Sequence, residues 1–204
     1  MGKNRLVVFV AACVLCAGAG VQANDGSIAV YLDDAGTQCE GNINGGAVFG
    51  SIYMNLAGAT ATGITGVEFR VDNSSPSSYM VSGSASPDAN LVIGDPFFLG
   101  VNEAFPTCQA GPRVKLFSLF ILEQSHNPDV TLTVRQRYEP TNYQYPCALA
   151  VLCDAPFYTT VCVGAPNSDH WRAVINPSAG VSGDCQPVAV QPTSWSTVKA
   201  LYLR

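Results

Sequence analysis

Alternation of apolar and polar residues with a period of two is the feature that most constrains the fold of this 204-residue chain. Val67, Phe69 and Val71 alternate with charged residues, and residues 130–138 repeat the pattern. Successive side chains of a β-strand point to opposite faces, so such a segment buries one face and exposes the other. We expect strands at residues 28–32, 48–56, 67–71, 79–82, 90–93, 97–101, 113–122, 130–138, 148–153, 158–163 and 171–175.

Short apolar segments separated by Gly and Pro turns indicate an all-β domain over residues 24–192. We predict an antiparallel two-layer β-sandwich of the immunoglobulin-like kind, with a closed barrel or a jelly roll as the alternative. Residues 193–204 are expected to form a short C-terminal tail helix. Its apolar face consists of Trp195, Val198, Leu201 and Tyr202. So short a helix is not stable alone in water, so the tail must dock on its own domain, on a neighbour or on an export partner. The alternative is a frayed end that covers a sheet edge.

Residues 1–23 have the organisation of a secretory signal peptide. Lys3 and Arg5 precede an apolar run that continues to Gly20, and a small-residue cleavage site ends at Ala23. The run is shorter than the ~20 residues that span a bilayer. We therefore expect a mature chain without a transmembrane segment, either secreted or held at the cell envelope. The alternative is a lipoprotein signal at residues 10–13, which would leave the chain lipid-anchored through an acylated Cys13.

The charge of the mature chain bears on its partners. Removal of the leader leaves eight basic and fifteen acidic residues, a net charge near −7. An acidic surface repels phosphate backbones, which argues against nucleic acid as a partner. Phosphate-loop and dinucleotide-binding motifs are absent from the sequence, and we expect no cofactor.

The cysteines that follow the leader predict disulfides in an oxidising compartment. They are Cys39, Cys108, Cys147, Cys153, Cys162 and Cys185. An extended run between Cys147 and Cys153 holds them ~20 Å apart, whereas a disulfide requires Cα atoms within ~7 Å. A hairpin that turns at residues 155–156 instead brings Cys162 near Cys147. The expected pairs are Cys147–Cys162, Cys153–Cys185 and Cys39–Cys108.

Two motifs at the ends of the mature chain carry a resemblance. Asp33, Gly36, Thr37 and Cys39 form an Asp-x-x-Gly-Thr-x-Cys motif, and Trp195 begins the closing Trp-Ser-Thr-Val-Lys-Ala-Leu-Tyr. In these segments the chain resembles a group of uncharacterised exported bacterial proteins. Members of that group have a signal peptide, a cysteine-bearing β-rich body and a W-x-x-(V/I)-K-x-L-Y tail. The resemblance implies export and a β-rich fold, and it implies no chemistry.

Candidate catalytic residues are few. Ser125, His126 and Asp129 lie together in the sequence, but neighbours on an extended chain point to opposite sides and cannot form a triad. We interpret this segment as a solvated turn, since Asn-Pro is turn chemistry. Asp169 and His170 are the nearest approach to a zinc site, and we interpret them as part of an ordinary loop.

Oxygen ligands suited to calcium gather on glycine-rich loops near the mature start. They are Asp33, Asp34 and Glu40, or alternatively Asn42 and Asn44. No EF-hand or nonapeptide spacing accompanies them, and Asx-rich turns have this composition for backbone reasons. We predict no metal site, with calcium at these loops as the open alternative.

The loop at residues 139–146 is the best candidate for ligand contact. It carries Tyr143 and Tyr145 between two prolines, and rigid, amphipathic tyrosines suit contact with sugars or protein surfaces. Trp171 and Tyr158 would extend this patch. The alternative is that the rings cover the end of the sandwich.

These observations favour a secreted or envelope-associated, non-enzymatic β-sandwich protein that acts by binding or assembly. Its expected partner is an extracellular protein or a carbohydrate. The alternative is a secreted hydrolase that acts on polysaccharide or peptide through carboxylates that lie far apart in the sequence. A third possibility is a passive structural protein that assembles through sheet edges.

Overall fold

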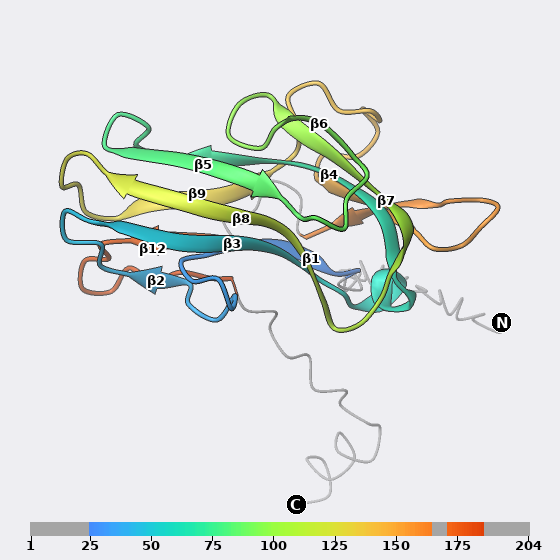
Figure 1. The fold of residues 1–204 in the computed structure, drawn as a ribbon, viewed down its shortest axis with the longest axis horizontal. Helices are drawn as coiled ribbons and strands as arrows, with labels where there is room; N and C mark the ends of the chain where they lie inside the picture. The colour runs from blue at the N-terminus through green and yellow to red at the C-terminus, as the bar shows by residue number, and fades with distance from the viewer. Residues whose placement is uncertain (1–24, 165–170, 186–204) are drawn as a thin grey trace, which may run out of the picture.

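The computed structural model describes residues 25–164 and 171–185, and Figure 1 shows them as two β-sheets packed face to face. The strands are β1 (Ser27–Tyr31), β2 (Glu40–Gly41), β3 (Ala47–Asn55), β4 (Ile64–Asn73), β5 (Tyr79–Ala85), β6 (Leu91–Asp95), β7 (Gly100–Gln109), β8 (Arg113–Glu123), β9 (Val130–Arg135), β10 (Ala148–Leu152), β11 (Thr160–Val163) and β12 (Arg172–Ile175), with a 3-10 helix η1 (Gly58–Thr62) before β4. Within the described ranges, no helix is long and apolar enough to cross a bilayer. The predicted signal peptide, with Cys13, and the predicted tail helix lie outside the described residues.

The smaller sheet has the strand order β1-β3-β8-β5 and is antiparallel throughout. In the larger sheet β4 is central. Its first half pairs with both β10 and β7, and its second half pairs with β9. The sheet continues from β10 to β11, from β7 to β6, and from β9 through β12 to β2, the last pair being parallel. The predicted all-β, two-layer sandwich is therefore confirmed.

The core lies between the inward faces of the two sheets. From β4, Val67, Phe69 and Val71 point inward, and each is at most 3% exposed. Phe69 meets Phe117 of β8 edge to face, with 6.0 Å between the ring centroids. Burial of each such side chain stabilises the fold by about 1.5–3 kcal/mol. The alternation that predicted β4 is thus the pattern that builds the core.

One predicted strand is displaced. We expected a strand at residues 97–101, but β7 occupies Gly100–Gln109. Phe97 instead lies in the β6–β7 turn, where the Asp95 carboxylate accepts its N–H at 2.8 Å. The register between β4 and β7 shifts near Ile64, which places residues 105–108 in a bulge. A bulge requires no continuous ladder, so Pro106 is tolerated there.

The first of the three disulfides that the described residues form joins the β10–β11 hairpin. Ala148 pairs with Val163 in the antiparallel register, which brings Cys147 close to Cys162. These two cysteines are bonded, with Cα atoms 5.7 Å apart. The prediction of this pair is therefore confirmed. It could be made from the sequence because the hairpin is local.

The other two predicted pairs, Cys153–Cys185 and Cys39–Cys108, are wrong. Cys108 bonds to Cys153 and Cys39 bonds to Cys185, with Cα separations of 5.7 and 5.3 Å. Since β7 and β10 both pair with the start of β4, Cys108 near the end of β7 meets Cys153 just after β10. Gly63 allows this approach, because a Cβ on it would lie 2.5 Å from the Cys108 Sγ. The strand order, which the sequence pattern does not reveal, decides the pairing.

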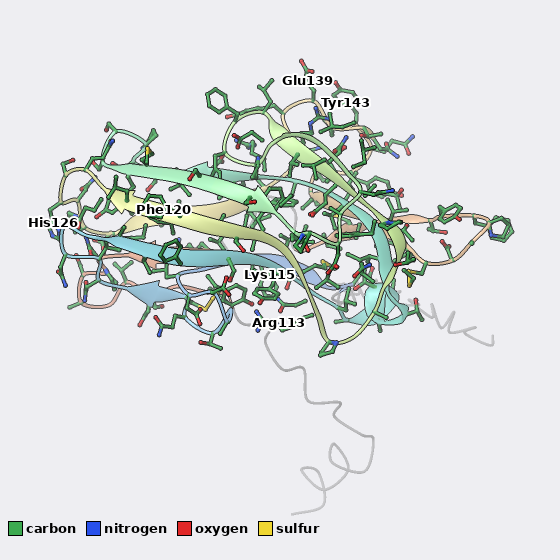
Figure 2. All side chains as sticks on the ribbon, viewed as in Figure 1. Arg113, Lys115, Phe120, His126, Glu139 and Tyr143 are labelled. Carbon is green, nitrogen blue, oxygen red and sulfur yellow. A yellow bond between two sulfur atoms is a disulfide. The ribbon has the colours of Figure 1, made fainter. Side chains whose placement is uncertain are left out.

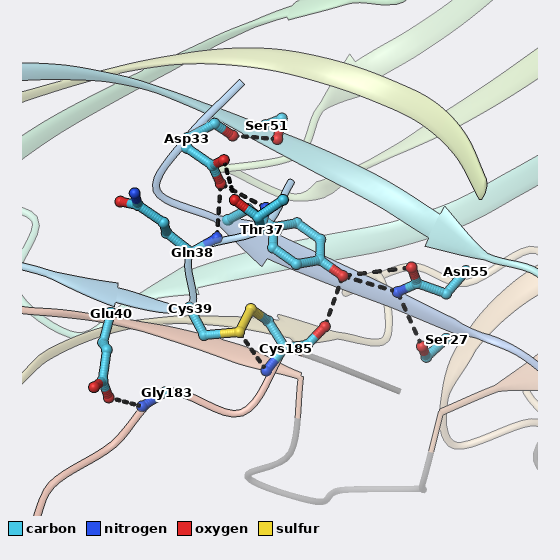
Figure 3. Close-up of a disulfide and its surroundings, with 11 residues drawn as sticks. Ser27, Asp33, Thr37, Gln38, Cys39, Glu40, Ser51, Asn55, Gly183 and Cys185 are labelled. Carbon is cyan, nitrogen blue, oxygen red and sulfur yellow. Dashed lines mark hydrogen bonds between the residues drawn. A yellow bond between two sulfur atoms is a disulfide. The ribbon is translucent and has the colours of Figure 1, made fainter. Parts of the chain in front are cut away.

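The Asp-x-x-Gly-Thr-x-Cys motif forms a turn that delivers Cys39 to its partner (Figure 3). The Asp33 carboxylate accepts the N–H of Thr37 at 2.7 Å and that of Gln38 at 2.8 Å. These bonds hold the pKa of Asp33 below its usual range despite partial burial. The motif therefore has a structural explanation, as the scaffold of the Cys39–Cys185 disulfide.

Tyr31 of β1 lies beneath this disulfide and is fully buried. Its hydroxyl donates to the Cys185 carbonyl at 2.7 Å and accepts from the Asn55 side-chain amide at 3.1 Å. The phenol therefore ties segment 183–185 to the outer face of the smaller sheet.

We predict that Tyr31→Phe lowers the free energy of unfolding by about 1–3 kcal/mol, because the Cys185 carbonyl and the Asn55 amide lose their buried partner. Urea denaturation measures this change. The matched control is Tyr53→Phe, whose hydroxyl donates to the Asp34 carbonyl at an exposed position. Its expected change is within about 0.5 kcal/mol. Equal losses in the two variants would contradict the structural role of Tyr31.

Candidate ligand-binding groove

A groove crosses the outer face of the larger sheet over β6, β7, β4 and β10. The strand register aligns the outward-facing residues of these strands and of β11 in two rows. One row is Ile93, Asn102, Glu68, Leu149 and Cys162, and the other is Leu91, Ala104, Gly66, Val151 and Thr160. A cavity of about 360 Å³ lies above these residues except Ile93 and Cys162, and Thr141 and Asn142 also line it. Its floor is thus mainly apolar.

Gly66 deepens the groove at its centre. A Cβ at this position would lie 3.8 Å from the Cα of Ala104 and 3.8 Å from a methyl group of Val151. It would also lie 3.0 Å from the Glu103 carbonyl oxygen. Because Gly66 has no side chain, this space between the two flanking strands stays open.

Glu68 fastens the loop at residues 136–147 to the sheet. Its carboxylate oxygens accept the Thr141 N–H at 3.0 and 3.1 Å, and one of them also accepts the Thr141 hydroxyl. The Asn102 amide donates to the same carboxylate at 2.8 Å in the orientation that satisfies both ends of the amide. Glu68 is only 6% exposed, and these bonds offset the cost of its burial. The loop forms one wall of the groove, and its position therefore depends on the Glu68 carboxylate.

Strand β6 forms one edge of the groove and is exposed along its whole length. Among the strands that the structure describes, it pairs only with β7. Leu91 and Ile93 are each 52% exposed, and Phe98 in the adjoining turn is 76% exposed. Edge strands are usually protected by Lys, Pro or a covering segment, whereas β6 carries one charge, at Asp95. The edge is therefore open to pairing.

The loop that carries the predicted Tyr143 and Tyr145 borders the groove through Thr141 and Asn142. Tyr143 is 78% exposed and directly follows the groove-lining Asn142. Figure 2 shows Tyr143 at the upper side of the molecule, the side on which Figure 1 shows β6. Tyr145 is anchored in the same loop, where its carbonyl accepts the Gln136 amide at 2.6 Å. Trp171 instead lines a separate cavity of about 190 Å³, to which the two ends of the loop contribute. Tyr158 lies on the β10–β11 connection.

Sequence reasoning missed the residues that shape the groove. Glu68 belongs to a segment that we interpreted only as a half-buried strand, Gly66 directly precedes that segment, and Asn102 lies beyond the strand expected at residues 97–101. The outward position of Glu68 was visible in the alternation of β4. Its bonding to Thr141 was not, because more than seventy residues separate the two in sequence.

His126 belongs to a hydrogen-bonded cluster at one end of the sandwich. Its Nδ1 lies 3.0 Å from the Glu123 carboxylate and 3.2 Å from the Asn176 amide. The Tyr79 hydroxyl donates to the same carboxylate at 2.8 Å. The backbone N–H of Gly45, which also donates to it, lowers the pKa of Glu123, and burial raises the pKa of Tyr79 to about 12. These contacts hold together the loops that follow β2, β8 and β12.

The two buried glutamates of the groove strands do not form a catalytic pair. Glu68 is opposite Asn102, and Glu103 is opposite Val67, so the two carboxylates point to opposite faces of the sheet. Glu103 therefore points into the core and is 2% exposed. Glycoside hydrolysis requires both carboxylates to flank one bond. The geometry gives the hydrolase alternative no support at this groove.

Glu103 is an acid buried in the core. Neither carboxyl oxygen has a hydrogen bond within the described part of the chain. The nearby Ser86 N–H donates instead to the Leu116 carbonyl at 2.7 Å. Burial raises the pKa of Glu103 to about 8, so the folded protein holds this group mainly protonated at neutral pH.

The carboxylates considered for calcium are engaged by protein groups. Asp33 accepts the backbone donors of its own turn, and Asp34 lies 2.5 Å from the Lys115 ammonium. Glu40 accepts the Gly183 N–H at 3.1 Å. Over residues 25–164 and 171–185, no three His, Cys, Asp or Glu side chains are grouped to hold a metal ion.

Comparison with known proteins adds only a general likeness of fold. No protein-family model and no curated protein matches this chain. A cohesin module from a family 33 glycoside hydrolase of Clostridium perfringens is 11% identical, covers 76% of this chain and all of its own, and has a TM-score of 0.48. The sixth cohesin of scaffoldin B from Acetivibrio cellulolyticus, solved in complex with a dockerin, is 14% identical over 75% of this chain and 99% of its own, with a TM-score of 0.45. The seventh ScaB type I cohesin from Pseudobacteroides cellulosolvens is 11% identical over 76% of this chain and 94% of its own, with a TM-score of 0.44. At these values the similarity carries no conclusion about function.

We predict that Glu68→Gln loosens the loop at residues 136–147. The amide keeps one acceptor oxygen but turns a donor toward the donors of Thr141 or Asn102, at an expected cost of about 1–3 kcal/mol. Hydrogen exchange of the Thr141 amide should become at least about tenfold faster, since 1.4 kcal/mol corresponds to tenfold. Glu139→Gln, at an exposed position of the same loop, is the control. Unchanged exchange in Glu68→Gln would show that the carboxylate does not hold the loop.

We predict that Glu103 makes the protein less stable as the pH rises from about 5 to 8. Because its folded pKa lies above the ordinary value of 4.5, the unfolded chain loses this proton first. The free energy of unfolding then falls with pH by up to about 1.4 kcal/mol per unit, and Glu103→Gln should remove this contribution. Denaturation series at several pH values measure the slope, with Glu139→Gln as control. Parallel curves for wild type and Glu103→Gln would contradict the buried, protonated acid.

Proposed function

We propose that this protein is a secreted or envelope-associated, non-enzymatic binding domain that takes up an extended segment of a partner protein along the edge of β6. The bound segment adds a strand to the larger sheet, and its alternate side chains reach toward the groove. Main-chain hydrogen bonds supply affinity in this mode of recognition, and pockets for alternate side chains supply specificity.

The observation that carries this proposal is the unprotected edge of β6. All five residues of β6 are exposed, and the strand carries apolar side chains where protective charges are usual. Leu91 and Ile93 point to the same face as the groove floor. An added strand would place every second side chain on this face, at intervals of about 7 Å.

The groove suits a peptide better than a sugar. Sugar sites present polar side chains whose hydrogen bonds are free for ligand hydroxyls, together with an aromatic platform. Here Glu68 and Asn102, the polar groups of the first row, bond to each other, and Glu68 also accepts the N–H of Thr141. The remaining floor includes Ala104 and Val151 and offers apolar contact. Apolar peptide side chains therefore match it.

A phage-displayed library of random decapeptides tests the proposal. Peptides that bind the full mature protein should alternate apolar and polar residues and should protect the β6 amides from hydrogen exchange. Leu91→Lys/Ile93→Lys should weaken their binding, measured by fluorescence anisotropy, by at least about tenfold. The matched control is Phe157→Lys, at a side chain 84% exposed on the β10–β11 connection, which should leave binding within about twofold.

Three outcomes would overturn the proposal. Protection of another surface by the bound peptides would place their site elsewhere. Equal weakening by the β6 and Phe157 variants would show that the contact is non-specific. Failure to select any peptide, with binding to a glycan array that Tyr143→Ala abolishes, would assign the site to carbohydrate.

A further inference from the structure

An apolar strip lies on the outer face of the smaller sheet, on the other side of the sandwich from the groove. The register aligns Phe49 with Phe120, and aligns Leu122 with both Ala47 and Met80. Phe49 is 69% exposed and Met80 is 43% exposed. The two phenylalanine rings lie 5.6 Å apart, and Figure 2 labels Phe120 on this face. We name these five residues the apolar strip. Contiguous exposed apolar side chains of this kind mark contact surfaces.

The other half of the same face is already covered by the chain itself. Tyr31 and Ser51 are paired across β1 and β3, and neither is exposed to solvent. Ser51 donates to the Asp33 carbonyl at 2.6 Å, and Tyr31 donates to that of Cys185. The disulfide to Cys39 fixes Cys185 there. Cys185, to which the tail at residues 186–204 is joined, therefore lies on this face.

The tail starts within reach of the apolar strip. On β3, Phe49 is two residues from Ser51, a distance of about 7 Å. Met80 lies on β5, which is two strands from β3 in the smaller sheet, and this adds about 10 Å. Nine residues connect Cys185 to Trp195 and span up to about 30 Å when extended. The connection is long enough to place the apolar part of the tail anywhere on the strip.

The tail has an apolar side that suits the apolar strip and a net charge opposite to that of residues 24–185. Its predicted apolar side is the one formed by Trp195, Val198, Leu201 and Tyr202. The tail carries Lys199 and Arg204 and no acidic residue, whereas residues 24–185 carry six basic and fifteen acidic residues. Opposite net charges favour association of the two parts. A helix of this length gains stability mainly by packing its apolar side on another surface.

We propose that the C-terminal tail, residues 186–204, docks on the apolar strip of its own chain. The tail then covers the half of the smaller sheet that segments 33–39 and 183–185 leave open. This docking is independent of the proposed function, because the groove and β6 belong to the other sheet.

Acrylamide quenching of Trp195 fluorescence in the full mature protein tests this docking. The signal of Trp195 is isolated by subtraction of the Trp195→Phe spectrum. Quenching should be several-fold stronger in Phe49→Ser/Phe120→Ser than in the wild type. The matched control, Phe98→Ser/Phe157→Ser, removes two phenylalanines that are 76% and 84% exposed elsewhere and should leave quenching unchanged. A second variant, Leu201→Asp, should also expose Trp195, and it leaves the sandwich itself unaltered.

The same measurements define what would overturn the proposal. Strong quenching of Trp195 in the wild type, equal to that in the strip variant, would show an undocked tail. Protection that survives both Phe49→Ser/Phe120→Ser and Leu201→Asp would place the tail on another surface. Trp195 could also be protected from quenching only at protein concentrations at which sedimentation shows a dimer. That result would assign the strip to a second copy of the chain.

Discussion

The pleat of β4 is the constraint on which the rest of the structure depends. Val67, Phe69 and Val71 point inward and meet the smaller sheet, as the contact between Phe69 and Phe117 shows. The alternate positions point outward, where Gly66 opens the groove and Glu68 holds its wall. A shift of one residue would exchange these two faces, and would bury Glu68 in the core while exposing the apolar set. One strand thus fixes both the core and the candidate site.

The neighbours of β4 are held in place by covalent bonds as well as by the ladder. The Cys108–Cys153 disulfide joins the ends of β7 and β10 across the start of β4, and Cys147–Cys162 closes the next hairpin. Disulfides that close long loops stabilise chiefly by restricting the unfolded chain, typically by about 2–4 kcal/mol. Here they also fix which strands border the groove. The site is therefore built on a part of the larger sheet that two disulfides constrain.

The sequence predicts the elements better than their arrangement. Alternation predicted β4 and the two-layer sandwich, and the local hairpin predicted Cys147–Cys162. The pairing of Cys108 with Cys153 depends on two strands that meet only through β4, which no local pattern reports. The loop at residues 139–146 was singled out for ligand contact, and the structure places its Thr141 and Asn142 at the groove. Trp171 lines a separate cavity, because hydrophobic pattern gives no information on which loops converge.

Disulfide mapping of the unreduced secreted protein, by mass spectrometry of its proteolytic peptides, tests the order β7-β4-β10 most directly. The structure requires peptides joined through Cys108–Cys153 and through Cys39–Cys185. A protein in which Cys108 is bonded to Cys39 instead would not have β7 and β10 on either side of β4. That result would contradict the groove and the account built on it.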